Sequence, residues 1–346
     1  MMSEDKPSEI DWKALFEAAS RFKEISCWEW MWDSDLFGVQ NPANNEIGYC
    51  CVMGRNREHF ALAVYLGTEG LQKYEEIQSG QMDEYGPDLL HSQKCIMVSF
   101  EDRKSLQEKD FNVIKKLGLS FRGKNAWPLF RSYLPGFFPW HLTKPEADFL
   151  LLSLQQTIDV ALRFKQEPDL FEPPRGKDDC YFVIVQKSID GAIVWENQWL
   201  LPPELKKPEI LQVPNVLAII QETKNYSPKQ TSWELDSFYS TVTVKDGEDR
   251  PYFPHQILFA DHIKGLVLHF QLLKPSENLS IAVAEEFRKA VKSLKFFPKE
   301  ILVSKEEIAV ALMPIATALG IKLILAGELP EIELVRYSMF ESFKKH

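Results

Sequence analysis

Residues 300–326, EILVSKEEIAVALMPIATALGIKLILA, decide the architecture of the C-terminal half. Within them, residues 304–307 have the pattern of a capping box that starts a helix, and Gly320 is well placed to end that helix. The flanking runs 300–303 and 321–326 are short and apolar, as buried strands are. A strand, a helix and a strand joined so tightly predict one right-handed parallel crossover.

The same stretch also resembles a membrane span. Residues 308–327 carry a single charge, Lys322, over about the length that crosses a bilayer. The capping box before this run and Gly320 inside it favour two separate elements instead. We therefore expect no contact with a membrane.

Outward from this stretch, the C-terminal half is rich in strand-like sequence. Turn signals at Asp190-Gly191 and Asp246-Gly247 predict hairpins. The expected strands cover residues 180–187, 192–200, 215–222, 237–245 and 257–271. The expected helices cover residues 280–294, 305–319 and 331–343. This pattern predicts a mainly antiparallel sheet with the crossover at its C-terminal end.

The N-terminal half mixes helical and extended patterns. Residues 48–53 and 60–66 are β-rich runs around a polar turn and predict a hairpin, with a further strand at 94–100. Residues 143–146 form a capping box with proline in the first turn. The expected helices cover residues 10–22, 68–78, 105–117 and 143–164.

Residues 165–179, KQEPDLFEPPRGKDD, separate the two halves with three prolines and many charges. A chain of 346 residues exceeds the usual size of a single core, so two domains are expected. We predict domains at residues 1–170 and 171–346. The predicted fold class is α+β, each domain having a mixed or mainly antiparallel sheet with packed helices.

Composition narrows the class of protein. Apolar residues make up 45% and charged residues 26%, which is ordinary for a globular chain. The five cysteines form no C-x-x-C pair or disulfide framework, and the N-terminus has no secretory signal pattern, so a cytoplasmic protein is expected. The net charge of −10 disfavours nucleic acid as a partner.

The strongest electrostatic anomaly is a basic window. Between Asp110 and Glu146 the sequence contains no acidic residue but six lysines and arginines. Aromatic residues and prolines alternate with these cations over residues 121–141, which predicts a long, stiffened loop. Guanidinium groups suit carboxylate or phosphate, and aromatic faces suit a ring or a peptide.

This window gives the leading functional hypothesis, a non-enzymatic binding protein that recognises a protein segment or a small anionic ligand through the loop 121–141. The candidate ligand-binding residues are Arg122, Lys124, Trp127, Arg131, Trp140 and His141. One alternative is a hydrolase-type enzyme with carboxylates and a histidine at the domain seam, among them Glu196, Asp236 or Asp261. Another is a structural interaction module, in which the loop only anchors one part of the chain to another.

Other motifs point to no chemistry. Residues 118–125, GLSFRGKN, nearly match a phosphate-binding loop, but Asn125 replaces its hydroxyl residue and the flanking elements do not fit. His255, His262 and His269 lie seven residues apart in a segment that looks extended, so a shared metal is not expected. Residues 27–33 alternate as a strand does and would place three tryptophans on one face, either as core or as an aromatic platform. No catalytic residue, metal or cofactor is predicted.

Three groups of residues resemble a family of uncharacterised bacterial proteins made of two tandem domains of unknown function. They are residues 49–54 (YCCVMG), residues 62–67 (LAVYLG) with Gly70-Leu71, and the residues Phe121-Arg122-Gly123, Trp127-Pro128, Arg131, Pro135-Gly136 and Pro139-Trp140. The resemblance implies a bacterial cytosolic protein with the same two-part layout. It implies no activity and no catalytic residue.

Overall fold

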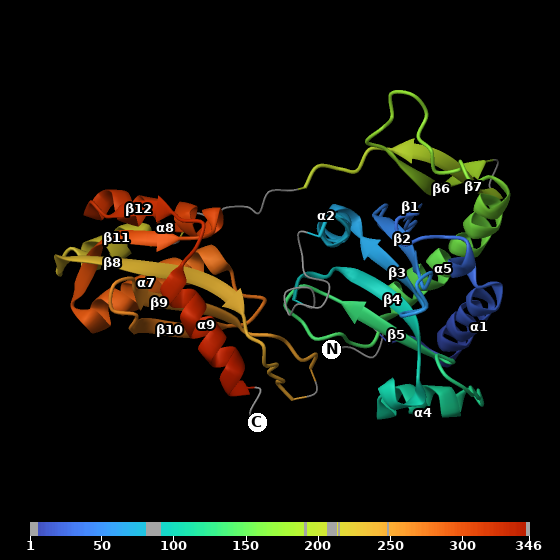
Figure 1. Ribbon diagram of the computed structural model, residues 1–346, viewed down its shortest axis with the longest axis horizontal. Coiled ribbons are helices and arrows are strands. Elements are labelled where there is room, and N and C mark those ends of the chain that lie inside the picture. The colour runs from blue at the N-terminus through green and yellow to red at the C-terminus, as the bar shows by residue number, and fades with distance from the viewer. Residues whose placement is uncertain are drawn as a thin grey trace. The chain divides into compact units, whose positions relative to one another are not determined.

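The computed structural model describes residues 6–80, 91–189, 192–205, 213, 215–247 and 249–343. The chain forms two compact units, of which the first contains residues 1–135 and 139–205, and the second residues 136–138 and 206–346 (Figure 1). Each unit is α+β, as predicted, with one sheet and helices packed on it. Within the described ranges, none of the helices combines the length and hydropathy needed to cross a bilayer.

The first unit is built on a seven-stranded sheet in the order β5-β4-β3-β2-β1-β6-β7. All neighbouring pairs are antiparallel except β1 and β6, which are parallel. The strands are β1 (Phe37–Gln40), β2 (Ile47–Met53), β3 (Ala61–Leu66), β4 (Cys95–Glu101), β5 (Trp127–Tyr133), β6 (Tyr181–Ile189) and β7 (Ala192–Leu200). The predicted hairpin of β2 and β3 is confirmed, with Cys50 opposite Val64.

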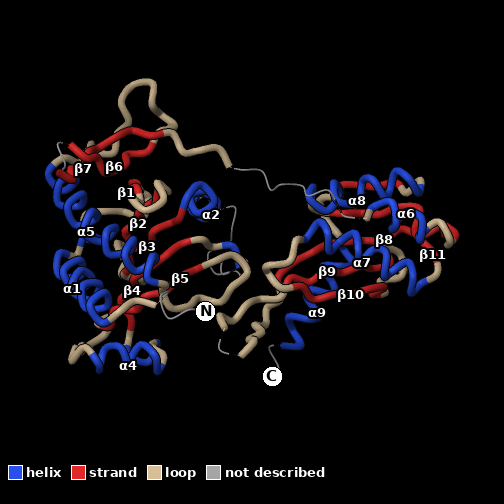
Figure 2. The backbone as a smooth tube through the Cα atoms, turned by 180° about the vertical axis from the view of Figure 1, so that it is seen from behind, coloured by secondary structure: helices blue, strands red, loops and turns tan. Residues whose placement is uncertain are grey.

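Helices cover both faces of this sheet. On one face, α1 (Glu9–Ile25) packs against α5 (Lys144–Gln166) (Figure 2). Both helices bury apolar side chains in the main core. On the other face, α2 (Gly67–Gln78) covers a smaller cluster rich in tyrosine and cysteine. The predicted capping box of α5 is present, because the Thr143 hydroxyl accepts from Glu146 N and the Glu146 carboxylate accepts from Thr143 N. Further helical segments of the described part of this unit include η2 (Cys27–Glu29), η3 (Arg103–Ser105) and α4 (Glu108–Lys116).

The second unit has a five-stranded sheet in the order β10-β9-β8-β11-β12. The strands β8 (Ser227–Tyr239), β9 (His255–Asp261) and β10 (Val267–Leu273) are antiparallel, whereas β11 (Phe296–Val303) runs parallel to both β8 and β12 (Lys322–Leu325). The helices α6 (Val216–Thr223), α7 (Leu279–Leu294) and α8 (Glu306–Leu319) share the larger core on one face. On the other face, α9 (Pro330–Phe343) packs against β8 and β9.

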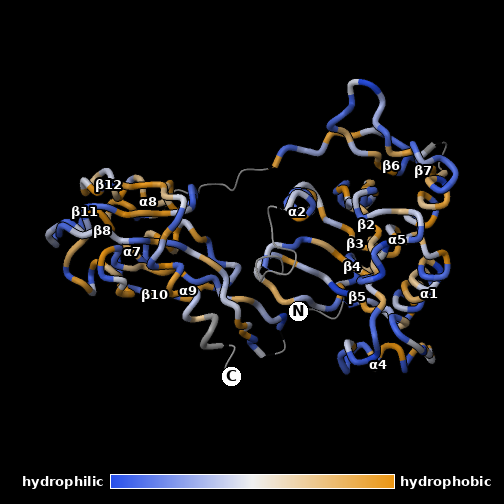
Figure 3. Tube along the Cα trace, in the orientation of Figure 1, coloured by the Kyte–Doolittle hydropathy of each residue, from blue (hydrophilic) through white to orange (hydrophobic). Residues whose placement is uncertain are grey.

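The crossover predicted from residues 300–326 is confirmed. The helix α8 connects the parallel strands β11 and β12, and Gly320 ends α8 with a left-handed φ of 67°. The colouring of α8 in Figure 3 is mainly hydrophobic, which explains why the sequence resembled a membrane span. The expected capping box is not formed, since the N-cap is Lys305 and no side chain caps the helix there.

Several expected elements differ from the structure. Of residues 215–222, expected as a strand, all except the N-cap Asn215 belong to the helix α6, because Ile219 and Ile220 fit the helical face that packs on the second core. The strand expected at 237–245 ends at Tyr239 and begins ten residues earlier than predicted, at Ser227. The single strand expected at 257–271 is the hairpin of β9 and β10, whose turn is held by the Asp261 carboxylate accepting from Ile263 N and Lys264 N. The expected turn at Asp190-Gly191 lies outside the described residues.

The domain boundary also differs from the prediction at residue 170. Because β6 pairs with β1 and β7 pairs with β6, the first compact unit continues to Leu205. In addition, the three residues Gly136, Phe137 and Phe138 belong to the second unit. There Phe138 N donates to Pro251 O and Phe253 N donates to Gly136 O, so these residues form a short antiparallel ladder with the β8–β9 connection.

Candidate functional site

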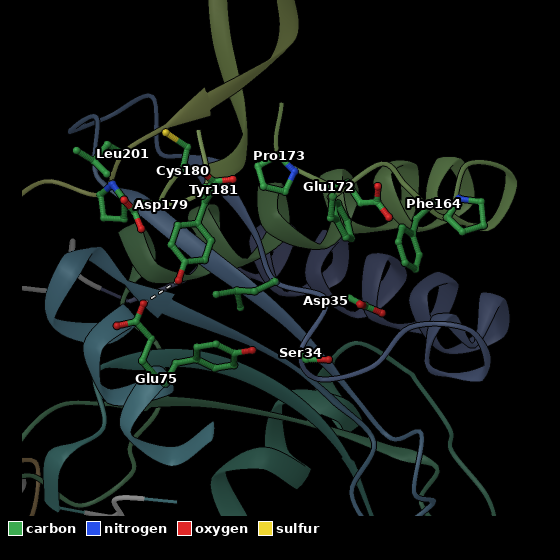
Figure 4. A pocket seen from close by; sticks show the side chains of 16 residues that line it. Ser34, Asp35, Glu75, Phe164, Glu172, Pro173, Asp179, Cys180, Tyr181 and Leu201 are labelled. Carbon is green, nitrogen blue, oxygen red and sulfur yellow. Dashed lines mark hydrogen bonds between the residues drawn. The ribbon is translucent and has the colours of Figure 1, made fainter. Parts of the chain in front are cut away.

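The described residues of the first unit form an open cleft of about 750 Å³ (Figure 4). Its walls come from the turn before β1, the C-terminal part of α2, the end of α5, the α5–β6 connection and the residues that follow β7. Backbone turns shape the α5–β6 connection, in which Glu172 N donates to Asp169 O and Cys180 N donates to Lys177 O. The cleft therefore forms where four segments that are separate in the sequence meet, because the end of α5 and the α5–β6 connection are continuous.

One wall of the cleft is aromatic. The rings of Phe164 and Phe171 stack with their centroids 4.7 Å apart, and Phe171 stacks in turn on the buried Phe37. Phe171 also contacts the buried ring of Phe182. Because these contacts join the wall to the main core, the aromatic surface is held rigidly in place.

Two tyrosines form the floor. The Tyr181 hydroxyl donates to Glu75 Oε1 at 2.7 Å, and the Tyr74 hydroxyl donates to the backbone oxygen of Asp33 at 2.8 Å. Burial raises the pKa of Tyr181, and the neighbouring Glu75 carboxylate raises it further. Both hydroxyl groups therefore stay protonated at neutral pH and act as hydrogen-bond donors.

The rim of the cleft is acidic. Among the described lining residues, five carry carboxylates and none is a lysine, an arginine or a histidine. The carboxylates belong to Asp35, Glu75, Glu172, Asp178 and Asp179. Burial raises the pKa of Asp35, although its carboxylate accepts a hydrogen bond from Trp32 N at 2.7 Å.

This arrangement defines the chemistry that the cleft supports. No group of three or more histidine, cysteine, aspartate or glutamate side chains converges as metal ligands do in the described part of the chain. The five carboxylates are instead distributed around an aromatic surface. Such a surface suits a cationic ligand that also has apolar parts, because carboxylates attract the charge and rings cover the apolar portion.

The structure places the six residues of the predicted loop site differently from one another. Arg122 and Lys124 are exposed in the connection before β5. Trp127 is the first residue of β5, and its half-buried ring packs between Phe111 and Phe121. Residues 127–133 are therefore a strand of the sheet, which corrects the expectation of one long loop over 121–141.

Arg131 and His141 lie beside the carboxylate of Asp110, and Trp140 lies next to His141. The buried Arg131 guanidinium donates to both oxygens of that carboxylate, at 2.9 and 2.7 Å. His141 Nδ1 lies 3.6 Å from Asp110 Oδ1, and burial together with Arg131 lowers the pKa of His141 to about 4. Trp140 contacts the His141 ring, and its backbone pairs with Ser132. The guanidinium that was expected to bind an anion is thus already paired within the first unit.

The tryptophans of residues 27–33 do not share a strand face, which corrects that expectation. The segment begins with the short helix η2 and continues as a turn. Trp28 is buried in the main core, Trp30 Nε1 donates to Ala161 O, and Trp32 is exposed beneath the Arg55 guanidinium. Two of the three rings therefore serve packing.

The histidines of the second unit have separate partners. His262 Nδ1 lies 2.6 Å from a carboxylate oxygen of the buried Glu234, and His269 Nε2 lies 2.6 Å from Glu286. His255 stacks on the ring of Tyr239. Among the candidate carboxylates, Glu196 pairs with Lys187, Asp236 lies 3.5 Å from Lys305 Nζ, and Asp261 caps its own turn.

Fold and site together define a two-domain α+β protein with an acidic, aromatic cleft in its first domain. Residues 12–181 match the family model described as Domain of unknown function (DUF7309), and residues 219–340 match Domain of unknown function (DUF6930). The chain thus carries these two domains of unknown function in tandem, which confirms the layout that the resemblance implied.

Other comparisons add little. No curated protein matches the chain. Among solved structures, the chain is similar to the catalytic core domain of HTLV-2 integrase in complex with magnesium, at 16% identity and a TM-score of 0.24. That match covers 31% of this chain and 65% of the length of the integrase chain.

Proposed function

We propose that the protein is a non-enzymatic binding protein whose first unit holds a basic, partly apolar segment of another protein in the acidic cleft. The observation that carries the proposal is a cavity with five carboxylates on its rim, aromatic rings in its wall and no cationic side chain among its described lining residues. This keeps the class of function expected from the sequence but assigns a ligand of the opposite charge.

Electrostatics supports a cationic ligand. Carboxylates gathered around one concavity focus a negative field there, and the net charge of −10 adds to the attraction at longer range. Because surface charges are screened within roughly 8 Å at physiological salt, the attraction acts mainly on groups inside the cleft. Binding through this surface should weaken as salt is added.

Size and shape support a protein segment over a single ion. A cavity of about 750 Å³ is within the range of sites that hold whole small molecules or several side chains. Its carboxylates stand on the turn before β1, on α2 and on the α5–β6 connection, so they are spread over several walls. In a segment with alternating basic and apolar residues, the basic side chains could pair with these carboxylates while the apolar side chains contact the aromatic wall.

Recognition of an anionic ligand through residues 121–141 is the rival proposal. Arg122 and Lys124 are exposed and accessible to such a ligand. Arg131 is not, because Asp110 occupies its donors and both side chains are largely buried. Binding of an anion would therefore depend on the two surface cations Arg122 and Lys124. This supports the anion-binding proposal less strongly than the formed cleft supports binding of a basic segment.

The test uses two labelled eight-residue peptides, one alternating lysine with leucine and the other alternating glutamate with leucine, and fluorescence anisotropy of the full chain. We expect the lysine peptide to bind. Replacing two exposed rim carboxylates, Glu172→Gln with Asp178→Asn, should weaken it roughly tenfold, because each partly exposed charge contributes up to about 1 kcal/mol.

A matched control distinguishes binding in the cleft from non-specific attraction to the net negative charge of the protein. The pair Glu17→Gln with Glu24→Gln removes two exposed carboxylates from α1 and changes the net charge equally. That variant should bind the lysine peptide within about twofold of the original chain. Equal weakening by both pairs would show only non-specific attraction. Binding of the glutamate peptide that is lost on Arg122→Ala with Lys124→Ala would establish the rival site instead.

A further inference from the structure

The two sheets have four edge strands, and three of them carry features that prevent pairing with another chain. β5 contains Pro128, and its outer side is partly paired through the Ser132–Trp140 bridge. β10 has a register shift next to His269, and the Gln271 side chain donates to the edge carbonyl of Leu272. β12 has only four residues and includes Lys322. Short length, proline, lysine and bulges are the usual protection of edges.

The fourth edge, β7, has none of these features. It contains nine residues and pairs with β6 without a register shift, from Tyr181 opposite Leu200 to Ile189 opposite Ala192. Its sequence, AIVWENQWL, includes neither proline nor lysine. Among the described strands, none pairs with its outer side.

Apolar side chains are exposed along this edge. Ile193 is 65% exposed, Val194 is 38% exposed, and Leu201, just after the strand, is 65% exposed. Trp195 and Trp199 are only partly buried, against the main core. An edge that is long, regular and apolar is a template for strand addition.

The sequence of the edge is nearly symmetrical about Asn197. Residues 193–201 read IVWENQWLL, and each residue before Asn197 resembles the one at the same distance after it. The matching pairs are Ile193 with Leu201, Val194 with Leu200, Trp195 with Trp199, and Glu196 with Gln198. Two identical antiparallel strands centred on Asn197 would place each of these residues opposite its match.

We propose that β7 pairs with β7 of a second copy of this chain, antiparallel and about a two-fold axis through Asn197. Identical patches meet in such an interface, so a self-complementary strand is what it requires. Aromatic and aliphatic cross-strand pairs stabilise antiparallel sheets. The one charge on the strand, Glu196, faces Gln198 of the second copy and keeps its ion pair with Lys187. The two seven-stranded sheets then become one continuous sheet.

The proposal does not rest on the proposed function of the cleft, although Leu201 also lines that cleft. It is tested by sedimentation velocity of the full chain without any peptide, between roughly 1 and 100 µM. We expect a concentration-dependent dimer. Ile193→Lys should weaken dimerisation at least roughly tenfold. The two-fold axis places the new lysine of each copy opposite the apolar Leu201 of the other copy, so the dimer contains two unfavourable pairs. The matched control is Leu325→Lys on the edge strand β12, where the leucine is 62% exposed, and it should dimerise as the original chain does.

A second substitution tests the register itself. Because residues 193 and 201 face each other across the axis, adding Leu201→Glu to Ile193→Lys should restore the dimer through two ion pairs, although Leu201→Glu by itself weakens it. Circular dichroism checks that each variant is folded. A chain that stays monomeric over this range overturns the proposal, as does a dimer insensitive to Ile193→Lys. Failure of the double substitution to restore the dimer overturns the pairing about Asn197.

Discussion

The ion pair of Arg131 with Asp110 offers a sharp test of how the first unit is held together. The side chains are 8% and 11% exposed and are joined by two short hydrogen bonds. At an effective dielectric constant of about 20, two charges about 4 Å apart attract by about 4 kcal/mol. Removing one partner of a buried pair costs about 3–5 kcal/mol, because the other charge is left without compensation.

The perturbation is Asp110→Asn, which keeps the shape of the side chain and an oxygen for the cap at Gln107 N. Since an amide oxygen still accepts one bond from Arg131, we expect a loss near the lower limit, about 3 kcal/mol. For a unit of this size that corresponds to a fall in Tm of roughly 6–12 °C. The chemically identical change Asp148→Asn, in an exposed pair with Lys144, should cost less than about 1 kcal/mol.

Tryptophan fluorescence during urea unfolding is the assay, because eight of the nine tryptophans belong to the first unit. The double substitution Asp110→Asn with Arg131→Met removes both buried charges and should recover much of the stability lost by Asp110→Asn. Equal losses for Asp110→Asn and Asp148→Asn would refute the view that burial makes this pair important. So would a double variant less stable than the single one.

Three further predictions follow from described contacts. Because the pKa of His141 is lowered to about 4 from its usual 6.5, the unfolded chain takes up this proton first as pH falls. The free energy of unfolding therefore has its full contribution from neutral His141 above about pH 6.5, and it falls toward pH 4 by about 1–2 kcal/mol after allowance for solvent screening. The variant His141→Gln should flatten this part of the pH dependence measured by urea unfolding. Gly136 has a φ of +77°, and a Cβ there would lie 2.9 Å from Tyr239 Cε1, so Gly136→Ala should destabilise the second unit by about 1–3 kcal/mol in calorimetry. Gly123→Ala, with φ +111° but open space, should cost less. Loss of the α5 cap in Thr143→Ala should lower the stability of the first unit by about 1 kcal/mol, and an unchanged urea midpoint would contradict this.

The elements that the sequence predicted well are those with strong local signals. The Thr143 capping box, the αL glycine Gly320 and the β-rich runs of β2 and β3 around a polar turn are local features, and the structure confirms each. Elements without local signals were missed. β1 has only four residues, and β5 begins with Trp127-Pro128, a pair more typical of loops. In α6 the second core imposes a helix on residues with strand propensity.

The cleft could not be predicted for a different reason. Its carboxylates are far apart in the chain, and each is unremarkable in its own segment, as Asp35 and Glu75 illustrate. Only the pairing of β6 with β1 brings the α5–β6 connection next to the turn before β1. The basic window between Asp110 and Glu146 misled for the opposite reason, because its charges are close together in the sequence. It was conspicuous in the sequence, but its acidic partner, Asp110, lay just outside it.

The short ladder formed by Gly136, Phe137 and Phe138 has a consequence for how the protein is made and studied. During synthesis these residues leave the ribosome long before Pro251 and Phe253, to which they are hydrogen-bonded. The second unit can therefore complete this ladder only after its own later residues have been synthesised. A truncated gene encoding residues 206–346 would lack that segment and leave the Pro251 carbonyl and the Phe253 amide without these partners. Dissection into separately expressed halves should therefore yield a less stable C-terminal piece than the intact chain contains.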